Sequence, residues 1–99
     1  MELLERKIDD IARLCRLYKV SKLFVFGSVL RETFNDESDI DLIVNFEQVP
    51  LEEYADNYFN LKFELESIFN RSVDLLEEEA IKNPYFKKEV DREKQLIYG

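Results

Sequence analysis

The stretch FGSVLRETFNDESDIDLIV, Phe26–Val44, places a Gly-Ser pair and an Asp-x-Asp pair in otherwise apolar sequence. The second half, DIDLIVNF, alternates as a β-strand does, so Asp39 and Asp41 project to the same side at the start of that strand. A buried charge without compensation costs several kcal/mol, and a second like charge beside it costs more. We therefore expect a positively charged group to sit between these two carboxylates.

The rest of the chain supplies regular elements around this stretch. Spacings of three and four residues between apolar positions indicate helices, and short apolar runs indicate strands. We expect Ser28 to open a short helical turn and the polar segment 31–38 to form a loop. The pattern predicts a helix over 2–18, strands over 22–27 and 39–46, a helix over 51–68 after Pro50, a strand over 71–76, and a helix that Asn83 and Pro84 begin, with Phe86 and Val90 inward.

This alternation predicts an α/β fold in which a small mixed sheet of about three strands packs with helices. At 99 residues, one domain over 1–99 with a single core is expected. Cys15 is the only cysteine, and it falls on the apolar stripe of the first helix. We interpret it as a buried thiol without catalytic function, since the chain has no histidine to activate it.

Two aromatic residues, Phe59 and Phe63, lie partly off the apolar stripe of the 51–68 helix, which we read as Leu51, Tyr54, Ala55, Tyr58, Leu61, Leu65 and Ile68. One interpretation is a wide core face. The other is a partner-binding surface, because aromatic clusters outside a core are often interface anchors.

The charge balance limits the classes of partner. The chain has 14 basic and 22 acidic residues, a formal net charge of -8, which repels phosphate backbones and anionic lipids at long range. No direct nucleic-acid binding and no membrane association are expected. The amphipathic, acidic start MELLERKIDDIARLC has no apolar run of signal-peptide or membrane-spanning type, and a cytoplasmic location is expected.

A third strand aspartate, Asp74, joins Asp39 and Asp41 if the second and third strands are neighbours. Mg²⁺ prefers oxygen ligands and is usually held by a few carboxylates together with substrate phosphates. The turn at Gly27 and Ser28 adds exposed N–H groups and a hydroxyl, which suit an anion. Each piece alone is commonly only a turn or a cap, whereas their order and spacing together indicate a metal-dependent phosphate chemistry.

An EF-hand is the other acidic motif to consider. No glycine follows the acidic residues at the spacing that such a calcium loop requires, and no glutamate closes the loop. The sequence therefore does not predict a calcium loop.

The segment GSVLRETFNDESDIDLIV resembles the signature of the minimal nucleotidyltransferases (MNT) of the polymerase-beta-like superfamily. RSVDLL is similar to the strand that carries the family's third aspartate, and IKNPYFKKEVDREKQLIYG resembles its C-terminal helix and tail. The resemblance implies the nucleotidyltransferase fold, with two Mg²⁺ ions on Asp39, Asp41 and Asp74. It also implies nucleotide phosphates at Gly27, Ser28 and Arg31.

The chain departs from the family pattern after the Gly-Ser pair. The family commonly has a small residue and then an Arg-Gly pair there, whereas here Val29, Leu30, Arg31 and Glu32 follow, so that Arg31 is kept in register and Glu32 replaces the glycine. Glu32 adds negative charge near the expected phosphate site.

The implied reaction is attack of a hydroxyl on the α-phosphorus of ATP, with pyrophosphate leaving and Asp74 as the base. By resemblance, stand-alone members of this size are antitoxins that transfer AMP to a tyrosine of a HEPN-type ribonuclease toxin. The acidic composition agrees with a basic partner. Two alternatives remain at this point: an antitoxin that acts by binding only, and nucleotidyl transfer to a small molecule. Homo- and hetero-oligomers are both compatible with the sequence.

Overall fold

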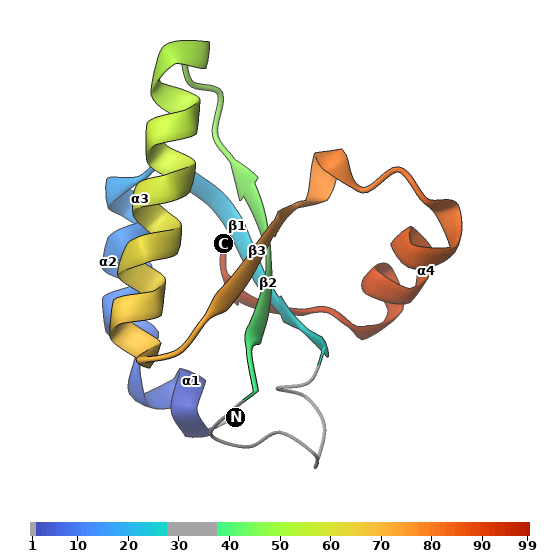
Figure 1. Cartoon of the computed structure of the whole chain (residues 1–99), viewed down its shortest axis with the longest axis horizontal. Coiled ribbons are helices and arrows are strands. Elements are labelled where there is room, and N and C mark those ends of the chain that lie inside the picture. The colour runs from blue at the N-terminus through green and yellow to red at the C-terminus, as the bar shows by residue number, and fades with distance from the viewer. Residues whose placement is uncertain (1, 28–37) are drawn as a thin grey trace.

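The structure is a computed structural model of the chain that describes residues 2–27 and 38–99. Figure 1 shows the arrangement of the elements. In chain order they are α1 (Glu2–Arg6), α2 (Ile8–Leu17), β1 (Val20–Phe26), β2 (Ile40–Phe46), α3 (Leu51–Phe69), β3 (Val73–Glu77), the 3₁₀ turn η2 (Glu78–Ala80), α4 (Pro84–Glu93) and β4 (Gln95–Tyr98).

In the part of the chain that the structure describes, four strands form one mixed sheet in the order β3-β2-β1-β4. β1 pairs antiparallel with β2 and with β4, whereas β2 and β3 run parallel. The predicted fold class is confirmed, but the expected count of about three strands misses β4. That strand is only four residues long, and its burial does not alternate along the strand, so its residues carry little strand pattern. It extends because the edge of β1 offers it backbone partners.

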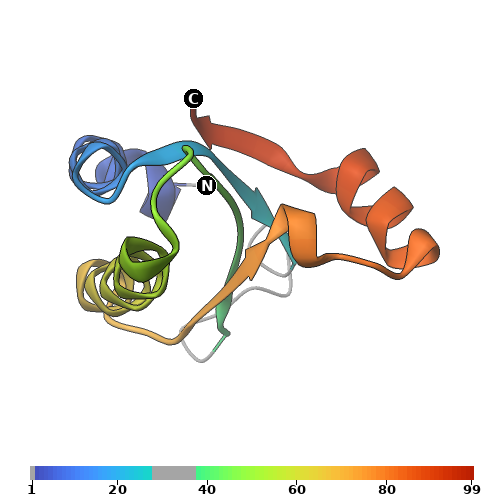
Figure 2. The ribbon, with the colours of Figure 1, turned by 90° about the horizontal axis from the view of Figure 1, so that it is seen from above.

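Helices cover both faces of the sheet. Figure 2 shows α2 and α3 side by side on one face and α4 on the other. The main core lies under α1, α2 and α3, where Leu23, Leu42 and Leu65 are fully buried. A smaller core lies under α4, around Phe26, Ile43 and Val90. Alternate residues of β1, β2 and β3 thus enter different cores, which explains why these strands read as nearly continuous apolar runs.

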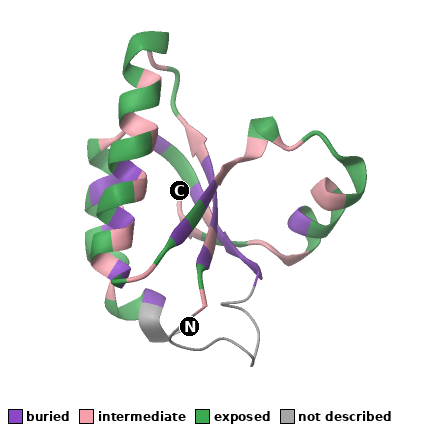
Figure 3. Cartoon of the chain, in the orientation of Figure 1, coloured by how far each residue is buried: buried purple, intermediate pink, exposed green. Residues whose placement is uncertain are grey.

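The helices differ from the expected ones in two places. The predicted 2–18 helix is divided, because Lys7 leaves the helical conformation (φ -106°, ψ 3°), for which we find no cause in the sequence. In α3, Leu61 and Leu65 are buried as predicted, but Leu51 is 84% exposed and Ala55 is exposed as well. Most residues in the first two turns of α3 are exposed, although Tyr58 packs against the main core. The ribbon at this end of α3 is largely green in Figure 3.

Several local predictions are confirmed. Cys15 is fully buried, and burial raises the pKa of its thiol to about 12. The Asn83 side chain caps α4 by accepting hydrogen bonds from the N–H groups of Tyr85 and Phe86. Val90 is buried, and Phe86 packs against the smaller core. None of the described helices is both long and apolar enough to cross a bilayer.

Candidate functional site

The parallel pairing of β2 with β3 places two of the predicted site aspartates opposite each other. The register aligns Asp41 with Asp74, and both side chains project to the face of the sheet that α4 partly covers. Asp39 lies just before β2, one alternation from Asp41 and on the same face. Asp41 is half-buried, whereas Asp39 and Asp74 are exposed. The expectation that the second and third strands are neighbours is confirmed.

The turn after β1 completes this arrangement. Gly27 follows Phe26, which pairs with Asp41, and Gly27 has a positive φ of 82° that side-chain-bearing residues rarely adopt. A Cβ at this position would lie 2.3 Å from Oδ2 of Asp41. The carboxylate therefore occupies the space that any side chain at position 27 would need, and the glycine is required for the close approach of turn and strand.

The backbone on both sides of Asp39 is held from the start of β3. Nη1 of Arg71 donates a 3.0 Å hydrogen bond to the Ser38 carbonyl. The Ile40 N–H donates a 3.1 Å hydrogen bond to the carbonyl of Ser72. Asp39 therefore sits on backbone that is fixed at both neighbouring residues.

The backbone around Asp74 is held from α3. β3 lies at the edge of the sheet, and one side of its backbone has no strand partner among residues 2–27 and 38–99. Glu66 accepts a 3.0 Å hydrogen bond from the Val73 N–H, and the Tyr58 hydroxyl donates to the Leu75 carbonyl. Burial, and then the negative charge of Asp74, raise the pKa of Tyr58, so its hydroxyl remains a donor at neutral pH. Two α3 side chains thus fix the residues on either side of Asp74.

Arg71, Glu66 and Tyr58 are supporting residues that the sequence analysis missed. Arg71 is separated from Ser38 by 33 positions in the chain, and Tyr58 from Leu75 by 17. Their contacts depend on how β2, α3 and β3 come together, and no local pattern identifies them. Ser28, Arg31 and Glu32, which the sequence analysis assigns to the phosphate region, lie outside the described residues.

The donor chemistry of this face suits a hard divalent cation. Asp41 and Asp74 offer carboxylate oxygens from facing positions, and such oxygens are the ligands that Mg²⁺ prefers. Within residues 2–27 and 38–99, however, no three acidic, cysteine or histidine side chains converge closely enough to enclose a metal ion. The fold therefore aligns Asp41 with Asp74 and places Asp39 one alternation away, without bringing the three side chains into one cluster.

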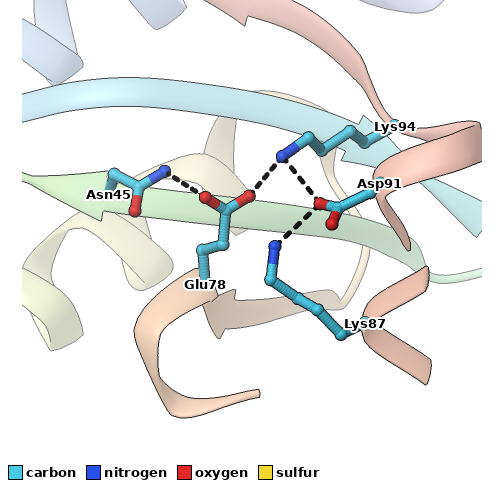
Figure 4. A network of polar contacts seen from close by, with 5 residues as sticks. All are labelled: Asn45, Glu78, Lys87, Asp91 and Lys94. Carbon is cyan, nitrogen blue, oxygen red and sulfur yellow. Dashed lines mark hydrogen bonds and ion pairs between the residues drawn. The ribbon is translucent and has the colours of Figure 1, made fainter. Parts of the chain in front are cut away.

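Farther along the same face, a polar network joins α4 to the sheet (Figure 4). Glu78 accepts hydrogen bonds from Asn45 of β2 and from Lys94 at the end of α4, and Lys94 also pairs with Asp91 at 3.2 Å. The Lys94 ammonium lies 4.4 Å from the centre of the Phe24 ring. These contacts fix α4 over the end of β2 that is remote from Asp39 and Asp41.

Phe59 and Phe63, for which the sequence allowed two interpretations, lie on α3, on the face of the sheet opposite to the aspartates. Phe59 is 53% exposed and Phe63 is 62% exposed on the outer side of α3. The core interpretation is wrong for both. Their exposure agrees with a partner-binding surface, which lies on the layer opposite to the aspartates.

Comparison with known proteins places this geometry in context. The family model described as "Nucleotidyltransferase domain" matches residues 11–97. A Methanocaldococcus jannaschii protein classed as a protein adenylyltransferase is 39% identical over 97 residues, covering 93% of this chain and 94% of that protein.

Solved structures share the fold. One classed as a minimal nucleotidyltransferase matches with a TM-score of 0.78 and 30% identity, over 95% of this chain and 92% of the other. A chain from the complex of a tri-AMPylated Shewanella oneidensis HEPN toxin with an MNT antitoxin matches with a TM-score of 0.64. It is 19% identical and covers 96% of this chain and 71% of that chain, so this second likeness concerns the fold alone.

Proposed function

Because the chain belongs to the nucleotidyltransferase domain family, we propose that it transfers AMP from ATP to a partner protein. The proposed partner is a HEPN-type toxin, and the proposed acceptor is the hydroxyl of one of its tyrosines. The observation that supports this most is the register of Asp41 with Asp74 above the Gly27 turn. The protein adenylyltransferase from M. jannaschii is similar over nearly its whole length, and the S. oneidensis complex contains an AMPylated HEPN toxin.

Each aspartate has a defined part in the proposed reaction. Asp39, Asp41 and Asp74 would hold Mg²⁺, which when bound neutralises phosphate charge and stabilises the leaving oxygens. The N–H groups of the turn at Gly27 and the hydroxyl of Ser28 bind the nucleotide phosphates. Glycine allows the backbone to approach them closely.

The acceptor oxygen forms a bond to the α-phosphorus while the bond from that phosphorus to the bridging oxygen of pyrophosphate breaks. Asp74 accepts the proton of the acceptor hydroxyl. Asp74 suits this role because its side chain is exposed and because Tyr58 and Glu66 hold the backbone on either side of it. A partner protein can therefore reach this carboxylate from solution.

A second candidate function is inhibition of the toxin by binding alone. The exposed Phe59 and Phe63 favour it, because they lie on the layer opposite to the aspartates, where a partner could bind without reaching the carboxylates.

The experiment incubates the protein with ATP, Mg²⁺ and a HEPN-type toxin, and measures the intact mass of the toxin. We expect added AMP with the parent and with Asp9→Asn, an exposed α2 control. Asp41→Asn should abolish transfer while the complex still forms, because the carboxylate acts on the transition state whereas docking uses a wider surface. Absence of added mass with the parent, together with full neutralisation by Asp41→Asn, would establish the binding-only function instead.

A further inference from the structure

Beyond the aspartates, β3, η2 and the beginning of α4 (orange in Figure 1) surround an apolar hollow of about 260 Å³. Its lining is Leu76, Glu77, Ala80, Ile81, Lys82, Asn83 and Phe86. We propose that this hollow binds the base of the nucleoside triphosphate. The inference rests on the proposed function, because the aspartates and the Gly27 turn account for the phosphates and leave the base without a site.

The position of the hollow supports this assignment in two ways. Leu76 follows Asp74 by one alternation on β3, so it lies on the same face about 7 Å farther along the strand. Phe86 packs edge-to-face on Phe26 with 5.9 Å between ring centres, and Phe26 directly precedes Gly27. Two residues that line the hollow therefore lie near the candidate site: Leu76 along β3, and Phe86 through its contact with Phe26.

The size and the surface of the hollow suit a planar ring system. Pockets that take a whole drug-sized ligand measure roughly 300–1,000 Å³, so a hollow of about 260 Å³ fits only a part of a nucleotide. Phe86 and Ile81 provide apolar surface, and bases stack favourably on aromatic side chains.

The rim of the hollow offers donors for a ring nitrogen. Oδ1 of Asn83 accepts hydrogen bonds from Tyr85 and Phe86 at 2.9 and 3.2 Å, so this oxygen is committed to the helix cap. The amide nitrogen of Asn83 keeps two donors for a further acceptor. Lys82, also on the rim, is exposed.

A second hollow, of about 250 Å³, is a weaker candidate. It lies beside Val44 and Asn45, at the end of β2 that is remote from Asp39 and Asp41, and Glu47, Glu77 and Glu79 line it. Glu77 borders both hollows, whereas Glu47 and Glu79 are additional carboxylates here that would repel a nucleotide. Burial is the main cause that raises the pKa of Glu77, and the nearby negative charge of Glu79 raises it further.

The test fills the hollow and compares two probes by calorimetry in Mg²⁺: ATP and inorganic tripolyphosphate. Ala80→Leu adds bulk inside the hollow, and Ala55→Leu adds the same bulk on exposed α3 as the matched control. We expect Ala80→Leu to raise the Kd for ATP about tenfold, the effect of losing one stacked base, and to leave the Kd for tripolyphosphate unchanged. Ala55→Leu should change neither.

A second variant, Phe86→Leu, keeps apolar volume but removes the ring, and it should raise the Kd for ATP several-fold without affecting tripolyphosphate. An unchanged Tm would show that packing on Phe26 is preserved. Equal ATP affinity in the parent and in both variants would overturn the assignment of the base while leaving the proposed function intact. If AMP transfer then fell at unchanged ATP affinity, the hollow would instead receive an acceptor side chain. If the parent bound neither probe, the proposed function would fail and the base site with it.

Discussion

Gly27 and Asp41 form a pair in which each residue restricts the other. Position 27 combines a φ of 82° with a carboxylate oxygen only 2.3 Å from the place of a Cβ. A substitution there therefore has two separate costs, a conformational one and a steric one. Only the second depends on Asp41.

These two costs can be measured separately. We expect Gly27→Ala to lower the free energy of unfolding by about 2–3 kcal/mol and to abolish ATP binding. In an Asp41→Ala background the same change should cost about 1 kcal/mol less, because the atoms in conflict are gone. Urea denaturation of the four proteins of this cycle checks it. An identical cost in both backgrounds would show that Asp41 moves aside freely.

Cys15 illustrates burial without function. Because burial raises the pKa of its thiol to about 12, the thiolate is scarce at neutral pH. Alkylation by iodoacetamide at pH 7.5 should be slow in the folded protein and fast in urea. The raised pKa also means that its contribution to stability is complete below about pH 9 and is lost as the pH rises towards 12. Cys15→Ala should reduce that alkaline loss, and rapid alkylation of the folded protein would contradict the buried assignment.

At the scale of elements, α4 depends on the network around Glu78. Partial burial raises the pKa of Glu78, but hydrogen bonds from Lys94 and Asn45 outweigh it and hold the pKa below 4.5. This stabilisation is therefore present above about pH 4.5 and is lost as the pH falls through the lower, folded-state pKa.

Lys94→Met keeps the length of the side chain over Phe24 but removes the charge. We expect it to lower the free energy of unfolding by about 1–2 kcal/mol, because Glu78 loses its cation in a partly buried place. Hydrogen exchange should accelerate in α4 and β4. Lys88→Met, on an exposed position of α4, is the control and should change little. If the two variants were equally stable, the network around Glu78 would not stabilise the position of α4.

The α3 helix has two sides with different functions. Its inner side supports β3 through Tyr58 and Glu66, and its outer side exposes Phe59 and Phe63. If the outer side docks the proposed toxin, Phe59→Ser with Phe63→Ser should raise the Kd of the complex at least tenfold, since buried aromatic anchors dominate interfaces. Circular dichroism and Tm should be unchanged, and an unaltered Kd would exclude this surface from docking.

For the whole molecule, the net charge of -8 affects how a partner is encountered. With the basic partner implied by the proposed function, the association rate constant should fall about tenfold between roughly 0.01 and 0.15 M ionic strength. The dissociation rate constant should change much less. Stopped-flow measurements at several salt concentrations give both rate constants. An association rate constant that does not depend on salt would mean that the partner does not bind at the acidic surface.

The sequence by itself determined the order of helices and strands apart from β4 and the break between α1 and α2, the cap of α4 at Asn83, the turn at Gly27 and the alternation that puts Asp39 and Asp41 on one face. These features follow from local chemistry: side-chain periodicity, capping groups and the conformational freedom of glycine. The assignment of Asp39, Asp41 and Asp74 as metal ligands stays a prediction, as do the roles of Ser28 and Arg31.

Only the tertiary structure decided that Asp74 stands opposite Asp41, since parallel register depends on how α3 crosses between β2 and β3. It also decided the exposure of Phe59 and Phe63, the pairing of β4 with β1 and the support of the site by Arg71 and Tyr58. Each of these is a contact between segments distant in the chain. Such contacts form where packing of the whole core favours them, and no local pattern of residues encodes them.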